Sequence, residues 1–205
     1  MKIVLIVEGQ TETVLLEPLR KFLEGHIPNS MPSLKVNKYD GRIPKQEKLK
    51  KLVEHLLNDG KRSADHVIAL TDVYTGTTPP DFENAADAID KMRNWVGDDS
   101  RFHPHAAQYD FEAWLLPYWK TIQTLAGHNK SAPPGHPEDV NHGKSPAYHI
   151  HEIFRIGTPG RKYVKTRDAK RILSKNDIGE AIRVCPQLKA LVNTILTVSG
   201  AEPLN

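Results

Sequence analysis

Cysteine is almost absent from this sequence of 205 residues, since Cys185 is its single thiol. A lone cysteine excludes a disulfide framework and a cysteine-rich zinc site. Long hydrophobic runs are missing too, because runs such as 3–7 and 67–70 fall far short of the roughly 20 residues of a membrane span. The apolar run at 3–7 is followed directly by Glu8, and no small-residue cleavage site comes after it. A secretory signal is therefore not indicated. We therefore expect a soluble, cytoplasmic protein with no membrane contact.

Charge of one sign is not in large excess, because the formal net charge is only +3. Its distribution is uneven, however, since eight Lys or Arg residues and one acid, Asp168, lie between Arg155 and Lys175. Such a block is either a solvated face or a patch that contacts phosphates. The residues that we predict to bind nucleic acid are Arg161, Lys162, Lys165, Arg167, Lys170 and Arg171.

The first half of the chain alternates between predicted strands and helices. Short apolar runs rich in β-branched residues indicate strands, and apolar residues at helical spacing indicate helices. The predicted strands cover 2–7, 34–39, 66–70 and 102–109. The predicted helices run from an N-cap at Thr11 to Gly25, over 45–58 and 81–96, and from 111 to 119. This order predicts an α/β fold with a mostly parallel sheet and crossover helices on both faces.

The second half of the chain follows a different pattern. Residues 130–146 are rich in proline and glycine, which predicts a long loop. Short helices are predicted after it, at 147–154, 169–173, 178–183 and 187–198. We therefore expect an α/β core in residues 1–125 and, in residues 126–205, a loop and helical extension packed on that core.

Acidic residues follow the predicted strands. Glu8 comes directly after the first strand, Asp72 after the third, and Asp110 and Glu112 after the fourth. Open parallel sheets bind their ligands at the carboxyl ends of the strands, so these carboxylates converge if the strands are neighbours. Such a cluster suits a hard divalent cation, and Mg²⁺ needs only one or two carboxylates plus substrate phosphates. Alternatively, Asp72 only accepts backbone hydrogen bonds in its loop.

Three motifs resemble known families. VEGQTE (7–12) resembles the glutamate motif of TOPRIM-type domains, which occur in topoisomerases, primases and OLD-family nucleases, and TDVY (71–74) stands where their paired-aspartate motif falls. DFEAWLL (110–116) is similar to a segment of RloB-like proteins and of a bacterial family of unknown function considered TOPRIM-related. Further matches to that family, which extend the resemblance over nearly the whole chain, are 80–82, 101–102, 137–146, 163–165 and 185–186.

The resemblance implies a TOPRIM-like parallel sheet flanked by helices, with a helical C-terminal extension. It also implies site roles: Glu8 is the acid/base or a metal ligand, Asp72 is a metal ligand, and Glu112, followed by Asp110, is the next candidate ligand. One departure is Tyr74, which occupies the position of the second aspartate of the family. Either Asp110 or Glu112 compensates, or the site holds one ion, or it is degenerate.

Cations are also expected near the reacting phosphate, where they would stabilise developing negative charge. Lys144 in the long loop and Lys165 and Arg167 in the basic block are the candidates. The leading hypothesis is a metal-dependent phosphodiesterase that uses Mg²⁺ or Mn²⁺ on DNA or RNA, as a bacterial defence component working with a partner ATPase. The alternative is a degenerate TOPRIM-like module that binds nucleic acid or such an ATPase, and a homo-oligomer stays open in both cases.

Overall fold

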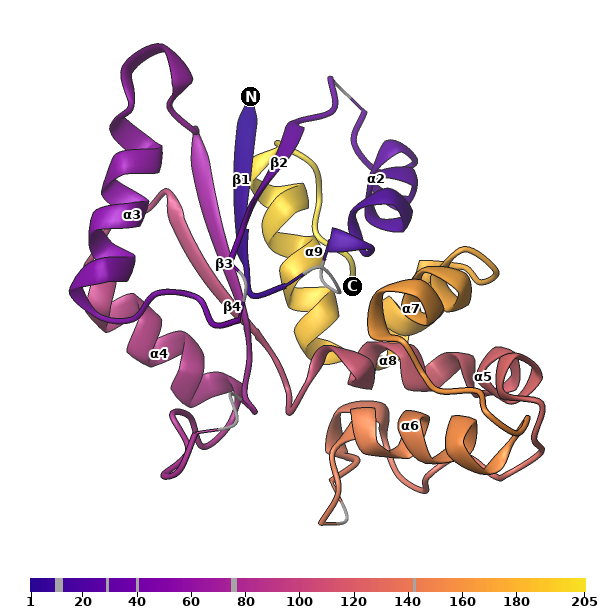
Figure 1. Cartoon of the computed structure of the whole chain (residues 1–205). Coiled ribbons are helices and arrows are strands. Elements are labelled where there is room, and N and C mark those ends of the chain that lie inside the picture. The colour runs from indigo at the N-terminus through magenta and orange to yellow at the C-terminus, as the bar shows by residue number, and fades with distance from the viewer. Residues whose placement is uncertain (10–12, 29, 40, 75–76, 142) are drawn as a thin grey trace.

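The computed structural model describes residues 1–9, 13–28, 30–39, 41–74, 77–141 and 143–205, so the predicted N-cap Thr11 lies outside the described residues. Four strands in this part of the chain form one sheet in the order β2-β1-β3-β4, and each neighbouring pair is parallel (Figure 1). The strands are β1 (Lys2–Val7), β2 (Ser33–Lys38), β3 (His66–Asp72) and β4 (Phe102–Ala107). The predicted α/β fold with a mostly parallel sheet is confirmed.

The place of each strand in the sheet agrees with its sequence. β1 and β3 are central, and burial on both faces explains their nearly continuous apolar sequences. β2 lies at one edge, where several of its residues are partly or fully exposed. β4 forms the other edge, which tolerates Pro104 because one side of an edge strand has no neighbour to hydrogen-bond.

Two predicted strand ends need correction. β4 ends at Ala107 instead of residue 109, because Tyr109 takes a left-handed backbone conformation with φ of +68°. β3 extends beyond residue 70, since Thr71 and Asp72 still pair with β4. The acidic residue that was expected after the third strand is therefore the last residue of that strand.

Helices cover both faces of the sheet, as predicted. α3 (Glu47–Asn58) and α4 (Ala85–Val96) lie on one face, and α2 (Leu16–Glu24) and α9 (Pro186–Val198) lie on the other (Figure 1). Successive side chains of β1 alternate between the two apolar clusters that result. Within the described residues, no helix is both long enough and apolar enough to span a membrane.

The helix predicted over 81–96 begins four residues later, at Ala85. The reason is that the side chain of Asn84 caps the helix by accepting a backbone N–H of the first turn. Asp81 instead lies in the preceding loop, where its carboxylate forms an ion pair with Lys45.

Helices also make up most of the second half of the chain. Beyond β4, the 3₁₀ helix η2 is followed by a group of short helices that lies beside the sheet, at the lower right of Figure 1, and α9 then returns to the sheet. A further 3₁₀ turn, η1 (Gly60–Arg62), follows α3. The elements of the second half before α9 are η2 (Phe111–Tyr118), α5 (Trp119–Ala126), η3 (Pro137–Asp139), α6 (Pro146–Ile156), α7 (Lys165–Leu173) and α8 (Ile178–Val184).

The start of α7 differs from the prediction for a local reason. The helix begins at Lys165, four residues before the predicted 169–173 segment. Asp168 is fully buried, and its carboxylate accepts the backbone N–H of Val164 at 2.8 Å. This hydrogen bond satisfies the N–H of Val164, the residue before the helix, and so stabilises the first turn. Residues 165–168 are therefore helical.

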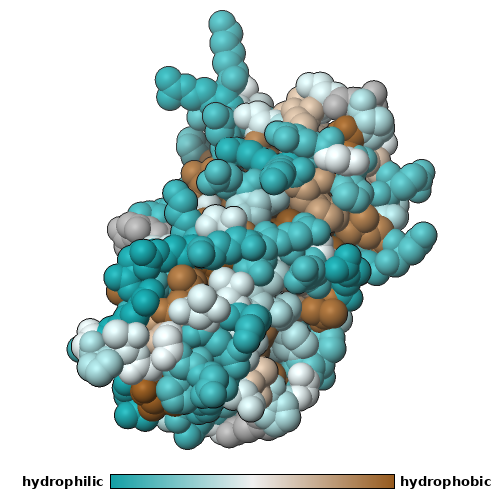
Figure 2. Space-filling view, turned by 90° about the vertical axis from the view of Figure 1, so that its right-hand side faces the viewer, coloured by the Kyte–Doolittle hydropathy of each residue, from teal (hydrophilic) through white to brown (hydrophobic). Residues whose placement is uncertain are grey.

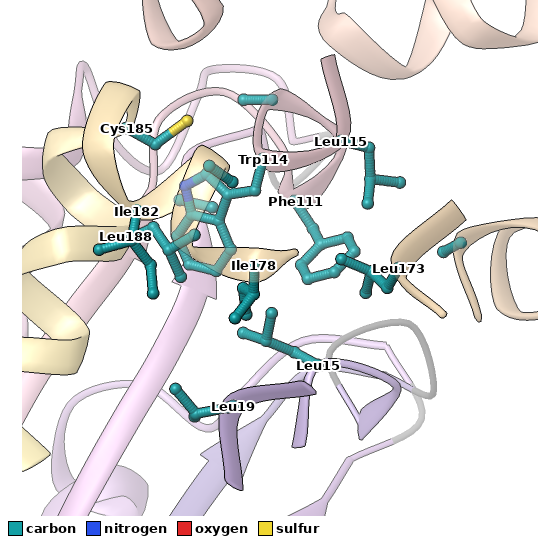
Figure 3. Packing of buried hydrophobic residues seen from close by; sticks show 14 of the residues in the cluster. Leu15, Leu19, Phe111, Trp114, Leu115, Leu173, Ile178, Ile182, Cys185 and Leu188 are labelled. Carbon is teal, nitrogen blue, oxygen red and sulfur yellow. The ribbon is translucent and has the colours of Figure 1, made fainter. Parts of the chain in front are cut away.

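A single apolar cluster joins the α/β core to the helices of the second half. Figure 3 shows Leu15 and Leu19, from the α2 region, below the rings of Phe111 and Trp114 in η2, with Ile182 of α8 beside Trp114. All five of these side chains are buried, so the two halves of the chain share one core.

The long proline-rich loop is tied to the same cluster through a buried acid. The Glu138 carboxylate accepts the indole N–H of Trp114 at 2.8 Å and the backbone N–H of Gln187 at 3.0 Å. The loop between α5 and α6 is thus held against both η2 and α9. The predicted division between residues 125 and 126 stays a prediction, and the shared cluster contains residues from both sides of it.

Close contact between α5 and the end of α6 makes Gly157 a test of this packing. A Cβ atom at Gly157 would lie 2.1 Å from the carbonyl oxygen of Ala126, a backbone atom that cannot move aside easily. We expect Gly157→Ala to lower the free energy of unfolding by about 1–3 kcal/mol, the usual cost of overpacking. Gly25→Ala is the matched control, since its Cβ would meet nothing closer than 3.5 Å. Urea denaturation that finds equal stabilities for the two variants would contradict this packing.

Candidate functional site

The predicted acidic residues lie at the end of the sheet where the strands have their carboxyl ends. We call this end of the sheet the acidic edge. β1, β3 and β4 are adjacent and parallel, so their carboxyl ends lie together. Glu8 follows β1, Asp72 ends β3, and Asp110 and Glu112 follow β4. The sequence-based prediction required these strands to be neighbours, and they are.

Glu8 and Asp72 occupy different sides of this edge. The register pairs Val7 with Leu70, which sets Glu8 next to Thr71, and the Thr71 hydroxyl donates a hydrogen bond to the Glu8 carboxylate. Because successive strand residues point to opposite faces, Asp72 turns to the face that carries α2 and α9. Lys165 lies on the same side, and the negative charge of Asp72 raises its pKa.

Asp110 is buried at the start of η2 and holds the beginning of α6. Both of its carboxylate oxygens lie 3.2 Å from the backbone N–H of Ala147, and the Ser145 side chain also hydrogen-bonds to it. Burial, together with the charge of nearby Glu112, raises the pKa of Asp110 to about 7. This carboxyl group is therefore partly protonated at neutral pH.

Glu112 is fully buried and is bound by two residues from a distant part of the chain. The hydroxyl of Tyr163 donates to its carboxylate at 3.3 Å, and the Lys165 ammonium lies 3.1 Å away. Burial alone would lower the pKa of Lys165, but the charges of Glu112, Asp72 and Asp110 outweigh it and raise that pKa. Lys165 is thus a protonated cation that interacts with three carboxylates.

Oxygen donors of this kind suit Mg²⁺ or Mn²⁺, but they do not form a complete metal cage. No three His, Cys, Asp or Glu side chains of the described ranges are placed to hold one ion, and residues 10–12 of VEGQTE lie outside those ranges. Glu8, Asp110 and Glu112 each bind a protein donor. An ion shared with substrate phosphates, for which one or two carboxylates suffice, therefore stays a prediction.

Four of the six predicted nucleic-acid-binding residues line one hollow of about 480 Å³. They are Arg161, Lys162, Arg167 and Arg171, together with Gly160 and Val164. We call this hollow, formed by the 160–164 loop and α7, the basic hollow. Figure 2 views the side of the molecule that lies to the right in Figure 1, where hydrophilic side chains dominate. The other two predicted residues are Lys165, at the acidic cluster, and Lys170, exposed on α7 outside the lining.

A buried acid holds two of the three arginines of the basic hollow in place. The Asp168 carboxylate accepts two hydrogen bonds from Arg167, at 3.0 and 2.7 Å, and lies 3.6 Å from the Arg171 guanidinium. Burial would raise the pKa of Asp168, but the hydrogen bonds and the charge of Arg167 lower it overall. Sequence reasoning missed this role, although a lone acid among eight cations was a visible signal.

Lys144 and Tyr74 lie close to aromatic neighbours. The exposed Lys144 ammonium is 4.5 Å from the centre of the Tyr148 ring, on the first turns of α6. The Tyr74 ring is tilted against that of Tyr109, with ring centres 5.2 Å apart, and its side chain hydrogen-bonds to Asn141. The catalytic role of Lys144 stays a prediction.

Comparison with solved structures defines the fold class. The chain is similar to the C-terminal region of the Burkholderia pseudomallei OLD protein, with a TM-score of 0.55 and 13% identity over 96% of this chain and 98% of that chain. Two structures of the C-terminal region of the Xanthomonas campestris pv. campestris OLD protein give TM-scores of 0.44 and 0.45. They are 12% and 14% identical, over 93% and 97% of this chain and 95% and 97% of theirs.

The chain belongs to the family described as Domain of unknown function (DUF4276), whose model matches residues 7–196. No curated protein sequence matches it. The predicted resemblance to a family of unknown function and to OLD proteins is confirmed at the level of family and fold. The match of each single motif stays a prediction.

Asp110 makes the stability of the protein depend on pH in a defined direction. Its pKa is raised from 3.8 to about 7, so between these values the folded state holds more protons than the unfolded state. The free energy of unfolding therefore falls as the pH rises through this window. Asp110→Asn removes this titration, while its amide oxygen can still accept the N–H of Ala147. Urea denaturation should show the wild type losing stability relative to the variant between about pH 4 and 7, and a constant difference would contradict the raised pKa.

The contact between Lys165 and Glu112 should appear as coupling between the two residues. Lys165→Met leaves a fully buried carboxylate without its cation, and we expect it to cost about 1–3 kcal/mol of unfolding free energy. In a Glu112→Gln background, where no charge is left unpaired, the same change should cost clearly less. A double-mutant cycle by urea denaturation measures this difference. An equal cost in both backgrounds would show that the two residues are not coupled.

Proposed function

We propose that this protein is a nuclease-like phosphodiesterase, which binds DNA or RNA along α7 and acts on it at the acidic edge of the sheet. One observation carries the proposal: α7 contributes to both places. Lys165, in its first turn, contacts Glu112, and Arg167 and Arg171, further along the helix, line the basic hollow. A phosphate chain held in that hollow would bring its next phosphates to Lys165.

The basic hollow has the properties of a phosphate site. Arginine guanidinium groups make short, charge-assisted hydrogen bonds to phosphate oxygens. Arg167 and Arg171 are already oriented by Asp168, so binding a phosphate would cost them less side-chain entropy. Phosphate contacts do not depend on the base sequence of the nucleic acid, and they weaken as the salt concentration rises.

The acidic edge supplies groups for phosphodiester chemistry. Lys165 would stabilise the negative charge that develops on the reacting phosphate. Asp110, with a pKa of about 7, is suited to give or take a proton near neutral pH, and Glu8 is the alternative acid/base. Mg²⁺ or Mn²⁺ would supply Lewis-acid polarisation of the phosphate. Asp72, with Glu112 or Asp110, would hold the ion on the side of Lys165, and Glu8, on the other side, could join them only by leaving Thr71.

A second candidate function is binding without hydrolysis. The observation that favours it is that Glu8, Asp110 and Glu112 are already bound by protein donors, while Tyr74 stands where a further acid was expected. In that case the same surfaces would bind nucleic acid or a partner ATPase. The partner ATPase, the defence role, the homo-oligomer and the cytoplasmic location all remain predictions.

Cleavage assays on labelled single- and double-stranded DNA and RNA separate the two functions. With Mg²⁺ or Mn²⁺, we expect the wild type to cleave at least one substrate. Asp110→Asn should lose about 10²–10⁴-fold in rate, the usual contribution of a proton-transfer group, and Asp72→Asn should also lose most of the activity. Their binding, measured in EDTA, should stay within a few-fold of wild type.

The matched control is Lys51→Ala, which removes an exposed cation from α3, where it pairs only loosely with Glu47 at 3.8 Å. It should change neither cleavage nor binding. Wild type that binds nucleic acid but cleaves none of the four substrates with either metal would favour the second candidate. Absence of both binding and cleavage would overturn the whole proposal.

A further inference from the structure

A second hollow of about 410 Å³ adjoins the basic hollow and is lined differently. Residues of α6 and of the 160–163 loop line it. Three of them carry rings (Tyr148, His151 and Tyr163), and four carry charges (Glu152, Arg155, Arg161 and Lys162). We call it the aromatic hollow. Residues 160–162 line both hollows, so a single stretch of chain separates them. Tyr148 and His151 have no place in the proposed chemistry, and Tyr163 takes part only through its hydrogen bond to Glu112.

The wall between the two hollows is a preformed turn. The backbone N–H of Arg161 donates to the carbonyl of Thr158 at 3.0 Å, with Pro159 and Gly160 between them. Gly160 has φ of +76°, which together with the preceding proline is the signature of a type II turn. The turn is fixed to α5, because the N–H of Thr158 donates to the Ala126 carbonyl at 3.0 Å. The two hollows are therefore held next to each other before any ligand arrives.

The rings of the aromatic hollow are accessible at one side and fixed at the other. Tyr148 is 41% exposed, so a ligand can reach its ring, beside which the Lys144 ammonium lies 4.5 Å from the ring centre. The Tyr163 ring meets His151 edge-on, with centres 4.9 Å apart, and its hydroxyl is held by Glu112. Burial lowers the pKa of His151, so this ring is mainly neutral at pH 7. These rings suit a planar ligand group.

The aromatic hollow offers rings, the basic hollow offers cations, and the two share one wall. Together they suit a ligand with a planar ring at one end and a phosphate at the other. We propose that they bind one nucleotide unit, with the base against Tyr148 in the aromatic hollow and the phosphate among Arg161, Lys162 and Arg171 in the basic hollow. This inference rests on the proposed function and adds a substrate class to it. A base inside a duplex enters a pocket only after it is flipped out of the stack, which costs free energy that an unpaired base does not need, so the favoured substrate is a single strand or an unpaired end.

Binding to small probes tests the base site without any cleavage. Adenosine monophosphate and ribose 5-phosphate carry the same phosphate, and only the first has a base. By isothermal titration calorimetry in EDTA, wild type should bind the nucleotide about five- to a hundredfold more tightly, the range of base–aromatic stacking. Equal affinities would overturn the inference.

Variants at one position locate the base. Tyr148→Ala should remove most of that preference and leave the affinity for ribose 5-phosphate unchanged, because the phosphate lies in the other hollow. Tyr148→Phe is the matched control, since it keeps the ring, and it should retain the preference. Lys162→Ala should weaken both probes to a similar extent. A preference that survives in Tyr148→Ala would place the base elsewhere and overturn the proposed site.

A third measurement separates a strand from a free nucleotide. Anisotropy of a labelled single-stranded oligonucleotide and of a hairpin duplex of the same length should show tighter binding of the single strand in wild type, and a smaller difference in Tyr148→Ala. Binding of the nucleotide with no preference for the single strand would overturn the substrate class and assign the site to free nucleotides. Because every measurement is of binding in EDTA, a failure to cleave nucleic acid would leave these results intact and would count only against the proposed function.

Discussion

The contact between Lys165 and the buried carboxylate of Glu112 is the interaction on which the candidate site depends. Glu112 is fully buried at the end of the sheet, where an ionised carboxylate is costly without donors. Lys165 and Tyr163, which donate to this carboxylate, come from the part of the chain that follows α6. The chain after α6 must therefore return to the sheet, and in doing so it brings α7 and the basic hollow beside the acidic edge.

This arrangement is not the most stable one for a protein core. Asp110 and Glu112 are buried like charges that repel each other, and Lys165 offsets only part of that repulsion, as the raised pKa of Asp110 records. Apolar residues at these positions would avoid the desolvation of the charges altogether. Groups that are buried at such a cost, and at the carboxyl edge of a parallel sheet, are what a site for chemistry needs. We therefore regard this strain as support for a reactive role over a purely structural one.

Much of the fold could be predicted because local sequence and tertiary position agree. β1 and β3 read as continuous apolar runs because both faces are buried, and each run ends near an acid, so the acidic edge was visible in the sequence. The start of α7 was missed because it depends on Asp168, whose burial comes from tertiary packing. The pairing of residues 112 and 165 was missed as well, since no spacing rule connects positions so far apart in the chain.

The two kinds of charge in the site are placed by different parts of the structure, with different physical constraints. Glu8 and Asp72 sit at strand ends, whose spacing the hydrogen bonds of the sheet fix, and Asp110 and Glu112 sit at the start of η2, shortly after β4. The cations sit on α7 and on the 158–161 turn, which are held by side-chain contacts such as those of Asp168 and by a single anchor on Ala126. Changes in this second layer can alter which ligand is bound while the sheet and its acids stay in place. Under the proposed function, substrate choice would therefore depend on the helical part of the chain, and the placement of the reactive groups would depend on the sheet.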